Sequence, residues 1–337
     1  MKKIGLNGFG RIGRAITRIN NGEQFEIVAV NDINPDIYNM AYLLKYDSVY
    51  GGYHDVKVLD DYNLEIAGQV VRVYHEDAVH RVPWELHDAD IIIDACGVMD
   101  PDYKFILNRG VDRIVFTHID NPEAKTIIFG VNEDSLKEDD RVLSASICDS
   151  IALAPIYKLL SERAPIKNGF LTTLHPWLAY QNLLDGPSKS WSHPGDVHSH
   201  YALGRSSIQN IIPKSTSAAM GAAKVIPEIV DKISAFSYRV PTQSVCGANL
   251  TLELEDGSIT RRETMQLFYD FEDRQTRNII NNTIEPLTSV DYKGNDASVI
   301  IDHRWTESVN DTSLRLVYWY DNEWGYSSRV VDLVSIL

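Results

Sequence analysis

Short apolar runs separated by polar, helix-like stretches fill the first 130 residues of the chain. Continuous runs such as Ile91-Ile92-Ile93 are typical of strands that are buried on both faces of a parallel sheet. The strands expected here are Lys2–Asn7, Phe25–Asn31, Ile91–Ala95, Arg113–Phe116 and Thr126–Gly130. Strands that alternate with helices in this way predict an α/β domain with a parallel sheet.

Beyond about residue 168 the pattern changes to longer strands in which apolar and polar residues alternate. The strands expected here are Phe170–Leu174, Ser237–Val240, Asn249–Glu255, Ser298–Asp302 and Leu314–Trp319. Alternation predicts an antiparallel sheet with helices on one side, an α+β domain. We therefore expect a first domain over residues 1–149, joined by a C-terminal helix at about 320–337, and a second domain over residues 150–319.

Composition narrows the classes of function. A chain of 337 residues is long enough for two domains. Its net charge of −15 argues against a protein that binds the nucleic-acid backbone, which needs clustered Lys and Arg. The chain has no run of 18 apolar residues and no signal-peptide pattern, so we expect neither a membrane nor a secreted protein. Three scattered cysteines favour a reducing, cytoplasmic setting and no structural zinc site.

A glycine motif follows the first strand directly. Gly8-Phe9-Gly10-Arg11-Ile12-Gly13 stands between that strand and a helix-like run that ends near Ile19. This is the GxGxxG pattern of a Rossmann dinucleotide site, in which glycines let the backbone approach a pyrophosphate at a helix start. The second strand ends in Asn31-Asp32, where an acidic side chain binds the adenosine ribose. Because this carboxylate repels a 2′-phosphate, NAD is favoured over NADP.

Cys148 is the candidate nucleophile. It stands between the strand-like run Arg141–Ser146 and a helix-like run from Ile151 to Ser161. A thiol at a helix start is stabilised as thiolate by the helix dipole. His175 follows the strand Phe170–Leu174, and adjacent strands would bring it to Cys148 as a base. Without its surroundings this pair is a weak signal, since buried inert cysteines are more common.

Motifs spread over nearly the whole chain resemble the glyceraldehyde-3-phosphate dehydrogenase family. The matching runs are Asn7–Arg14, Leu43–Gly51, Gln209–Pro213, Lys224–Glu228, Arg239–Thr242 and Trp319–Ser327. The resemblance implies an α/β Rossmann NAD-binding domain, an α+β catalytic domain and a homotetramer. It also implies NAD-dependent oxidation of an aldehyde phosphate, by default glyceraldehyde 3-phosphate, through a Cys thioester that phosphate resolves, as a step of glucose metabolism.

The resemblance also assigns roles to residues. Cys148 aligns with the family's nucleophile and His175 with its base, which removes a hydroxyl proton while hydride leaves. The residues implied in cofactor binding are Gly8, Gly10, Arg11, Ile12, Gly13, Asp32, Thr117 and Asn322. Asn322 aligns with the residue that orients the nicotinamide carboxamide. The residues implied in binding the substrate or inorganic phosphate are Thr216, Arg239, Ser150 and Arg205.

The chain departs from the family at the nucleophile. The family reads Ala-Ser-Cys-Thr-Thr-Asn, whereas this chain reads Ser146-Ile147-Cys148-Asp149-Ser150-Ile151. Ile147 and Asp149 thus replace two hydroxyls near the attacking phosphate. A carboxylate about 6 Å from a phosphate charge opposes it by roughly 3 kcal/mol at an effective dielectric constant of about 20. Leu178 replaces a threonine that holds the substrate's own phosphate, as in erythrose-4-phosphate dehydrogenases.

Two further segments differ from the family. The loop of residues 189–204 is about nine residues longer than usual and carries His193, His198 and His200. We expect packed or solvated imidazoles rather than a metal site there, because no ligand spacing is convincing. His118 stands beside Thr117 where the family has residues that border the nicotinamide, and either a contact or a structural role fits it.

Two other functions stay open from the sequence. One is oxidation of another aldehyde, such as erythrose 4-phosphate, with water releasing the acid. The other is a catalytically silent NAD-binding relative of the enzymes. Retention of Cys148, His175, Arg239 and Asn322 argues against the silent form.

Overall fold

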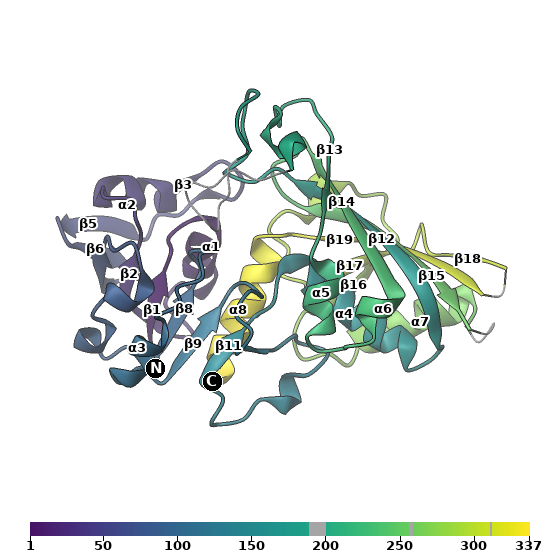
Figure 1. Ribbon diagram of the computed structural model, residues 1–337, viewed down its shortest axis with the longest axis horizontal. Coiled ribbons are helices and arrows are strands. Elements are labelled where there is room, and N and C mark those ends of the chain that lie inside the picture. Colours follow the sequence, from purple (N-terminus) through teal and green to yellow (C-terminus); the bar gives the residue numbers. More distant parts are fainter. Residues whose placement is uncertain (189–199, 256–258, 311) are drawn as a thin grey trace. The chain divides into compact units, whose positions relative to one another are not determined.

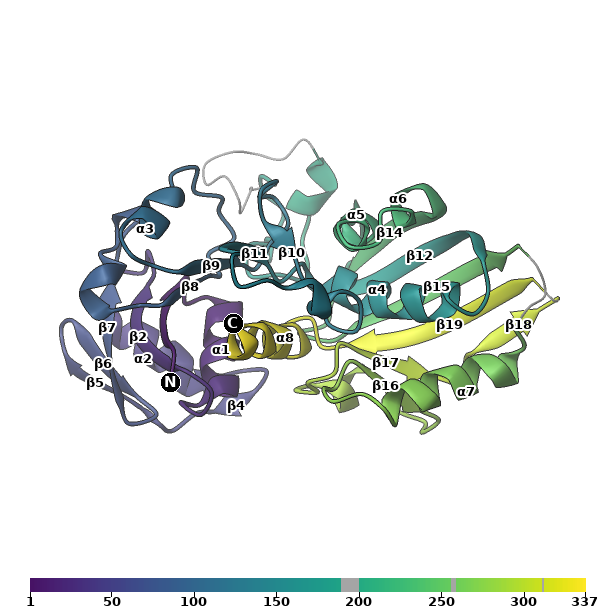
Figure 2. The same ribbon diagram turned by 90° about the horizontal axis from the view of Figure 1, so that it is seen from below.

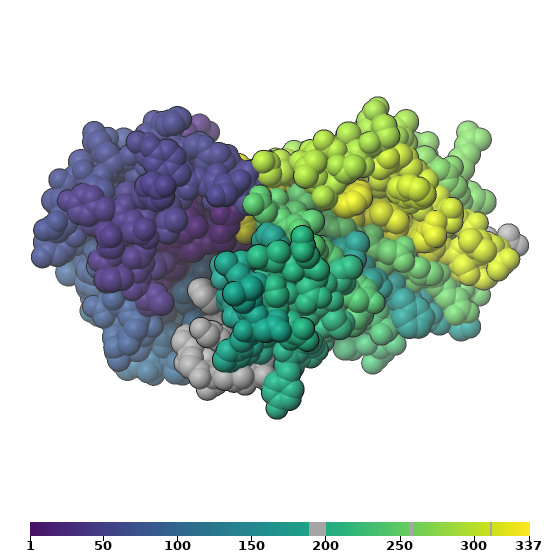
Figure 3. Space-filling view, turned by 90° about the horizontal axis from the view of Figure 1, so that it is seen from above, coloured from purple at the N-terminus to yellow at the C-terminus, as the bar shows by residue number. Residues whose placement is uncertain are grey.

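The computed structural model describes residues 1–188, 200–255, 259–310 and 312–337, and it divides into two compact units (Figure 1). Unit 1 comprises residues 1–127, 134–146 and 327–337, and unit 2 comprises residues 128–133 and 147–326. The chain thus passes into unit 2 directly before Cys148 and returns within the last helix. In Figure 3 the surface of unit 1 is mainly purple to blue and that of unit 2 mainly teal to yellow, as these ranges require.

Unit 1 is built on a nine-stranded sheet in the order β10-β11-β9-β8-β1-β2-β7-β6-β5. Its strands are β1 (Lys3–Asn7), β2 (Glu26–Asn31), β5 (Val56–Asp60), β6 (Asn63–Ile66), β7 (Gln69–Tyr74), β8 (Ile91–Asp94), β9 (Arg113–Phe116), β10 (Lys125–Thr126) and β11 (Val142–Ser144). All neighbours from β10 to β7 pair in parallel. Every residue of β8 is buried, as expected for a strand covered on both faces.

The helices of unit 1 are α1 (Arg11–Asn20), α2 (Ile37–Lys45) and α3 (Lys104–Asn108), and a small ribbon pairs β3 (Tyr46–Asp47) with β4 (Gly51–Gly52). Helix α8 (Trp324–Ile336) begins in unit 2 and lies in unit 1 from Ser327 onward. The predicted α/β Rossmann fold is confirmed. The sequence analysis missed β5, β6 and β7, of which β5 and β6 extend one edge by antiparallel pairing.

Unit 2 contains a second sheet in the order β13-β14-β12-β15-β19-β17-β16, with β18 beside β19. Its strands are β12 (Ile166–Pro176), β13 (Ile212–Ser215), β14 (Ile233–Val240), β15 (Cys246–Leu254), β16 (Ile280–Thr283), β17 (Val299–Asp302), β18 (Glu307–Val309) and β19 (Ser313–Tyr320). Its helices are α4 (Cys148–Ser161), α5 (Ala218–Ala223), α6 (Ile229–Lys232) and α7 (Arg261–Glu272). Helices α5 and α6 contact β14, and α7 contacts β16 (Figure 2).

The second sheet is mixed rather than purely antiparallel, because β12 pairs with β14 and β16 with β17 in parallel. The parallel β12–β14 pair sets His175 directly beside Arg239. The predicted strand Thr126–Gly130 is wrong beyond its first residue: β10 ends at Thr126, and Ile128 and Gly130 instead form turns that Asn132 and Glu133 hold through their side chains. Among the described helices, none is long and apolar enough to span a membrane.

Candidate active site

The glycine turn has the shape of a dinucleotide cradle. Gly8 has φ +91°, and a Cβ there would lie 2.6 Å from the backbone nitrogen of Cys96. A Cβ on Gly13 would lie 2.1 Å from the carbonyl oxygen of Gly8, so only glycine lets α1 pack this closely on the turn. An added Cβ on Gly10 would point into open space, with no neighbouring atom within 4 Å. These three glycines fit a pyrophosphate that approaches the backbone where α1 begins.

Arg11 and Ile12 are the first residues of α1, so their backbone N–H groups lie at the helix start, where an anion is favoured. The Arg11 side chain itself is paired with Asp47. Asp32 follows β2, and its Oδ2 accepts a hydrogen bond of 2.6 Å from the backbone N–H of Phe9. The carboxylate is thereby fixed beside the turn, where it can accept hydrogen bonds from ribose hydroxyls.

Three buried polar side chains join the carboxyl ends of the central strands. Asn31 donates to Asn7 over 2.8 Å, and Asn7 donates to Asp94 over 3.0 Å. Thr117 donates its hydroxyl to the Asp94 carbonyl. His118 packs against Phe116, and its Nδ1 accepts a hydrogen bond from the Asp120 backbone N–H. These hydrogen bonds link the carboxyl ends of β1, β2 and β8.

Cys148 is the first residue of α4, three residues earlier than the helix-like pattern indicated. Ser146, two residues before it, has φ 62°, a conformation that is uncommon for a residue with a side chain. This turn leads from β11 into α4 and sets the thiol at the helix N-terminus. Cys148 is partly exposed, whereas Cys246 is buried.

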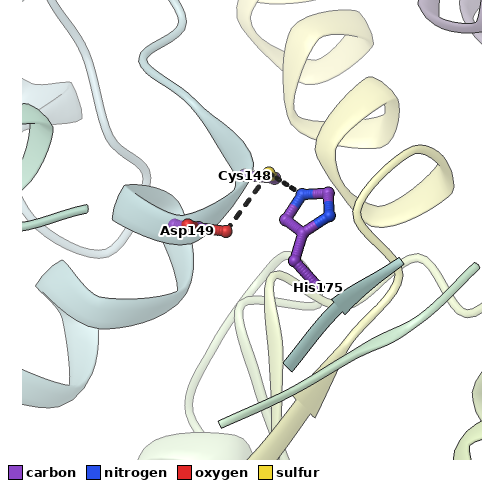
Figure 4. A group of neighbouring side chains, drawn as sticks. All are labelled: Cys148, Asp149 and His175. Atoms are coloured by element: carbon purple, nitrogen blue, oxygen red, sulfur yellow. Dashed lines mark hydrogen bonds between the residues drawn. The ribbon is translucent and has the colours of Figure 1, made fainter. Parts of the chain in front are cut away.

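His175 lies within reach of the thiol. It is a buried residue near the end of β12, and its Nε2 is 3.9 Å from the Sγ of Cys148 (Figure 4). Its Nδ1 lies 2.8 Å from the carbonyl oxygen of Pro176. That carbonyl can only accept, so Nδ1 carries the proton and the Nε2 lone pair faces the sulfur. The ring is therefore oriented to take a proton from Cys148 or from a group bound to it.

Asp149 completes the cluster in Figure 4. Its Oδ1 lies 3.5 Å from the Sγ of Cys148 and accepts a 2.7 Å hydrogen bond from the hydroxyl of Tyr320. Its Oδ2 accepts a 2.7 Å hydrogen bond from the hydroxyl of Thr216. Asp149 therefore does not face solvent. It uses the Thr216 hydroxyl that the sequence analysis assigned to inorganic phosphate.

The pKa shifts in this cluster do not favour the Cys148 thiolate that the sequence predicted. Burial, followed by the charge of Asp149 and its hydrogen bond, raises the pKa of the Cys148 thiol, and Arg239 offsets this only in part. Burial and then Arg239 lower the pKa of His175 to about 4, against the opposing charge of Asp149. Burial alone would raise the pKa of Asp149. The interactions with His175, with the two hydroxyl donors and with Arg239 outweigh burial and lower this pKa. These shifts favour the protonated thiol, the neutral imidazole and the charged carboxylate.

Arg239 is buried at the end of β14, and its Nε has no hydrogen-bond partner among the described residues. Burial lowers the pKa of Lys214 in β13 most, and the nearby positive charge of Arg239 lowers it further. Two cations in one partly buried region favour an anionic substrate group.

The other candidate phosphate ligands already have protein partners. Ser150 is buried, and its hydroxyl donates to the Ala218 carbonyl over 2.8 Å. The guanidinium of Arg205 is exposed and paired with Asp185. Asn322 is buried, and its Oδ1 accepts from the Val245 backbone, which orients its amide nitrogen away from that contact. Of the loop histidines, His193 and His198 lie outside the described residues.

Sequence reasoning did not single out Tyr320 or Lys214. Tyr320 is 171 residues from Asp149 along the chain, and it is the last residue of β19. The only available signal was its place within the motif Trp319–Ser327.

Comparison with known proteins matches the chain in two parts. Residues 2–101 match the glyceraldehyde 3-phosphate dehydrogenase NAD binding domain, and residues 147–322 match the C-terminal domain of the same enzyme. The chain belongs to the glyceraldehyde-3-phosphate dehydrogenase family. It is an NAD-dependent oxidoreductase of that type, which agrees with the resemblance in its motifs.

Individual relatives match over nearly the full chain. The chain is 37% identical to glyceraldehyde-3-phosphate dehydrogenase of Cryphonectria parasitica, with 99% of this chain and 96% of the relative covered. It is 36% identical to a cytosolic glyceraldehyde-3-phosphate dehydrogenase of Dianthus caryophyllus, covering 99% and 97%. It is also 36% identical to a chloroplastic one of Arabidopsis thaliana, covering 99% and 77%. The relatives' names therefore leave the compartment of this glyceraldehyde-3-phosphate dehydrogenase family member undecided.

Proposed function

We propose that this protein oxidises glyceraldehyde 3-phosphate with NAD through a thioester on Cys148. The observation that carries the proposal is the pair formed by the Cys148 Sγ and the His175 Nε2, 3.9 Å apart beside the buried Arg239. All the relatives compared above are glyceraldehyde-3-phosphate dehydrogenases, so oxidation of another aldehyde such as erythrose 4-phosphate is not favoured.

The residues supply a balanced sequence of proton steps. His175 takes the thiol proton as Sγ attacks the aldehyde carbon, and passes it to the carbonyl oxygen, giving a hemithioacetal. The backbone N–H groups at the start of α4 stabilise negative charge on that oxygen meanwhile. His175 then removes the hydroxyl proton as the C–H bond breaks, leaving a thioester. The glycine turn and Asp32 would hold NAD, which when bound would accept the hydride.

Release of the thioester is where the chain's departures matter. We propose that inorganic phosphate attacks the thioester but binds weakly, because Asp149 holds the Thr216 hydroxyl and places a carboxylate near the incoming anion. Slow attack by phosphate leaves time for hydrolysis, so some free acid forms alongside acyl phosphate.

The test of the reaction is NADH formation from a panel of aldehydes, measured against phosphate concentration with the product identified. Glyceraldehyde 3-phosphate should give the highest kcat/KM, together with acyl phosphate. A preference for erythrose 4-phosphate with free acid as the only product would overturn the proposal, and NAD binding without any oxidation would indicate a silent relative.

Asp149→Thr combined with Ile147→Ser should lower the KM for phosphate by about a hundredfold, because removing a carboxylate about 6 Å from the anion gains roughly 3 kcal/mol. Initial rates against phosphate concentration measure this effect. The matched control is Asp273→Asn, which removes an exposed carboxylate elsewhere in unit 2. An unchanged KM for phosphate in the double variant would show that Asp149 does not oppose the anion.

The choice of cofactor should depend on Asp32. We expect the wild-type protein to prefer NAD over NADP by at least about tenfold in kcat/KM, a factor that needs only about 1.4 kcal/mol. Asp32→Ala should narrow the preference, mainly by weakening NAD binding, because the ribose loses its acceptor. Steady-state kinetics with both cofactors check this, and equal use of the two by the wild type would contradict the assignment.

We also propose a cytoplasmic homotetramer that acts in glucose metabolism. The three cysteines are unpaired, which is typical of a reducing compartment.

Phe170, Leu174 and Phe236 are exposed on one face of the sheet, since Thr172 pairs with Phe236 and residues two apart share a face. Exposed apolar side chains on one face favour an interface. Analytical ultracentrifugation measures the oligomeric state, and a monomer in solution would disprove the tetramer.

A further inference from the structure

The acid next to the nucleophile is not explained by catalysis. A nucleophilic cysteine needs a base, which His175 provides, whereas a carboxylate 3.5 Å from the sulfur opposes the thiolate. Asp149 is nevertheless buried and held by two hydroxyl donors. A bound divalent cation removes this repulsion, because the carboxylate and the thiolate are then both attracted to the metal.

We propose that Cys148, Asp149 and His175 form a three-ligand site for a thiophilic divalent metal, with Zn²⁺ as the best fit. One ligand atom from each residue lies within 4.8 Å of the other two. In a tetrahedral zinc site with bonds of about 2.0–2.3 Å, the ligand atoms lie about 3.5 Å apart. The separations from the sulfur, 3.5 Å to the carboxylate and 3.9 Å to the imidazole, need little adjustment.

The groups around the three side chains are those that orient metal ligands. A metal-bound histidine donates its other ring N–H to a carbonyl or carboxylate, and ligating carboxylates are themselves hydrogen-bonded. Here the Nδ1 of His175 donates to Pro176, and Asp149 accepts from Thr216 and Tyr320. The orienting contacts are therefore in place before any metal binds.

The ligand set selects the metal and leaves room for a fourth ligand. A thiolate and an imidazole favour Zn²⁺ over Mg²⁺ or Ca²⁺, which prefer oxygen ligands. The three protein ligands leave one position of a tetrahedral ion for water or another small ligand. The charges of Arg239 and Lys214, which act on the same cluster, reduce the affinity.

Metal binding and aldehyde oxidation exclude each other. Coordination releases the thiol proton to solvent and forms a metal–sulfur bond, with no change of oxidation state. The sulfur lone pair and the His175 Nε2 are then both engaged, so neither attack on an aldehyde nor proton transfer occurs. Zn²⁺ thus acts as a reversible inhibitor whose third ligand, Asp149, stands where the family has threonine.

Binding is tested on the full chain without NAD or aldehyde, so its outcome is independent of the proposed oxidation. Zn²⁺ is titrated against a chromogenic chelator, and Co²⁺ serves as the spectroscopic probe. We expect one metal per chain and a thiolate-to-cobalt charge-transfer band that Cys148→Ser abolishes. Asp149→Asn should weaken Zn²⁺ binding about tenfold or more, and the matched control Cys96→Ser should leave it unchanged.

Absence of the cobalt–thiolate band in the wild type would overturn the proposal. Equal Zn²⁺ affinity of the wild type and Asp149→Asn would also overturn it, because the metal would then be bound by the thiol and the imidazole without Asp149. Should Asp149→Asn fail to fold, Asp149→Thr restores the side chain of the family and makes the same comparison. A second measurement uses the wild type alone: Zn²⁺, but not Mg²⁺, should slow iodoacetamide labelling of Cys148, and equal labelling with both metals would contradict the site.

Discussion

Cys148→Ala should abolish NAD reduction while NAD binding stays within a few-fold of the wild type. The loss is complete because the described residues offer no second nucleophile beside the His175 Nε2, and the thioester cannot form without sulfur. The affinity for NAD is preserved because the glycine turn and Asp32 lie in unit 1. Initial rates and equilibrium titration with NAD measure the two effects separately.

Cys96→Ala is the matched control, since it removes the thiol of unit 1 and should leave NAD reduction intact. Iodoacetamide should label Cys148 before Cys96 or Cys246, because Cys148 alone has an imidazole acceptor, 3.9 Å from its sulfur, among the described residues. Burial raises the pKa of all three thiols, so access to a base decides the order. Preferential labelling of Cys96 at neutral pH would be evidence against Cys148 as nucleophile.

Local patterns predicted the central elements of the fold. The fully buried strand β8, with its run of three isoleucines, and the glycine turn before α1 each carry their signal within a few residues, because burial on both faces and close backbone packing exclude most side chains. The strands β5, β6 and β7 at one end of the sheet have weaker signals, since one face of each is only partly buried and they contain Asp, Asn and Gln. The parallel pairing of β12 with β14 depends on contacts between distant segments, which strand alternation does not report.

The residues proposed for catalysis followed from motif and resemblance, but their charges did not. A cysteine at a helix start was expected to ionise, and Cys148 does begin α4. The sequence gives no sign that the neighbouring carboxylate turns inward, since that depends on Thr216 and Tyr320, which lie 67 and 171 residues away. Their two hydrogen bonds hold Asp149 beside the thiol, where its charge adds to the effect of burial in raising the pKa of Cys148.

His175→Asn should slow NAD reduction by about 10²–10⁴-fold, the usual effect of losing a general base. Asparagine keeps a polar side chain of similar reach but cannot take a proton, so the aldehyde should still bind beside Arg239 with little change in KM. The loss should therefore appear in kcat and in the single-turnover rate of NADH formation. It should be larger than in an enzyme whose cysteine is already a thiolate, because burial and Asp149 raise the pKa of the Cys148 thiol, so His175 is needed in both proton steps. The control is His54→Asn at an exposed histidine of unit 1, which should change kcat less than twofold. A loss below tenfold in His175→Asn would show that another group, with Asp149 the nearest acceptor to the sulfur, removes the proton.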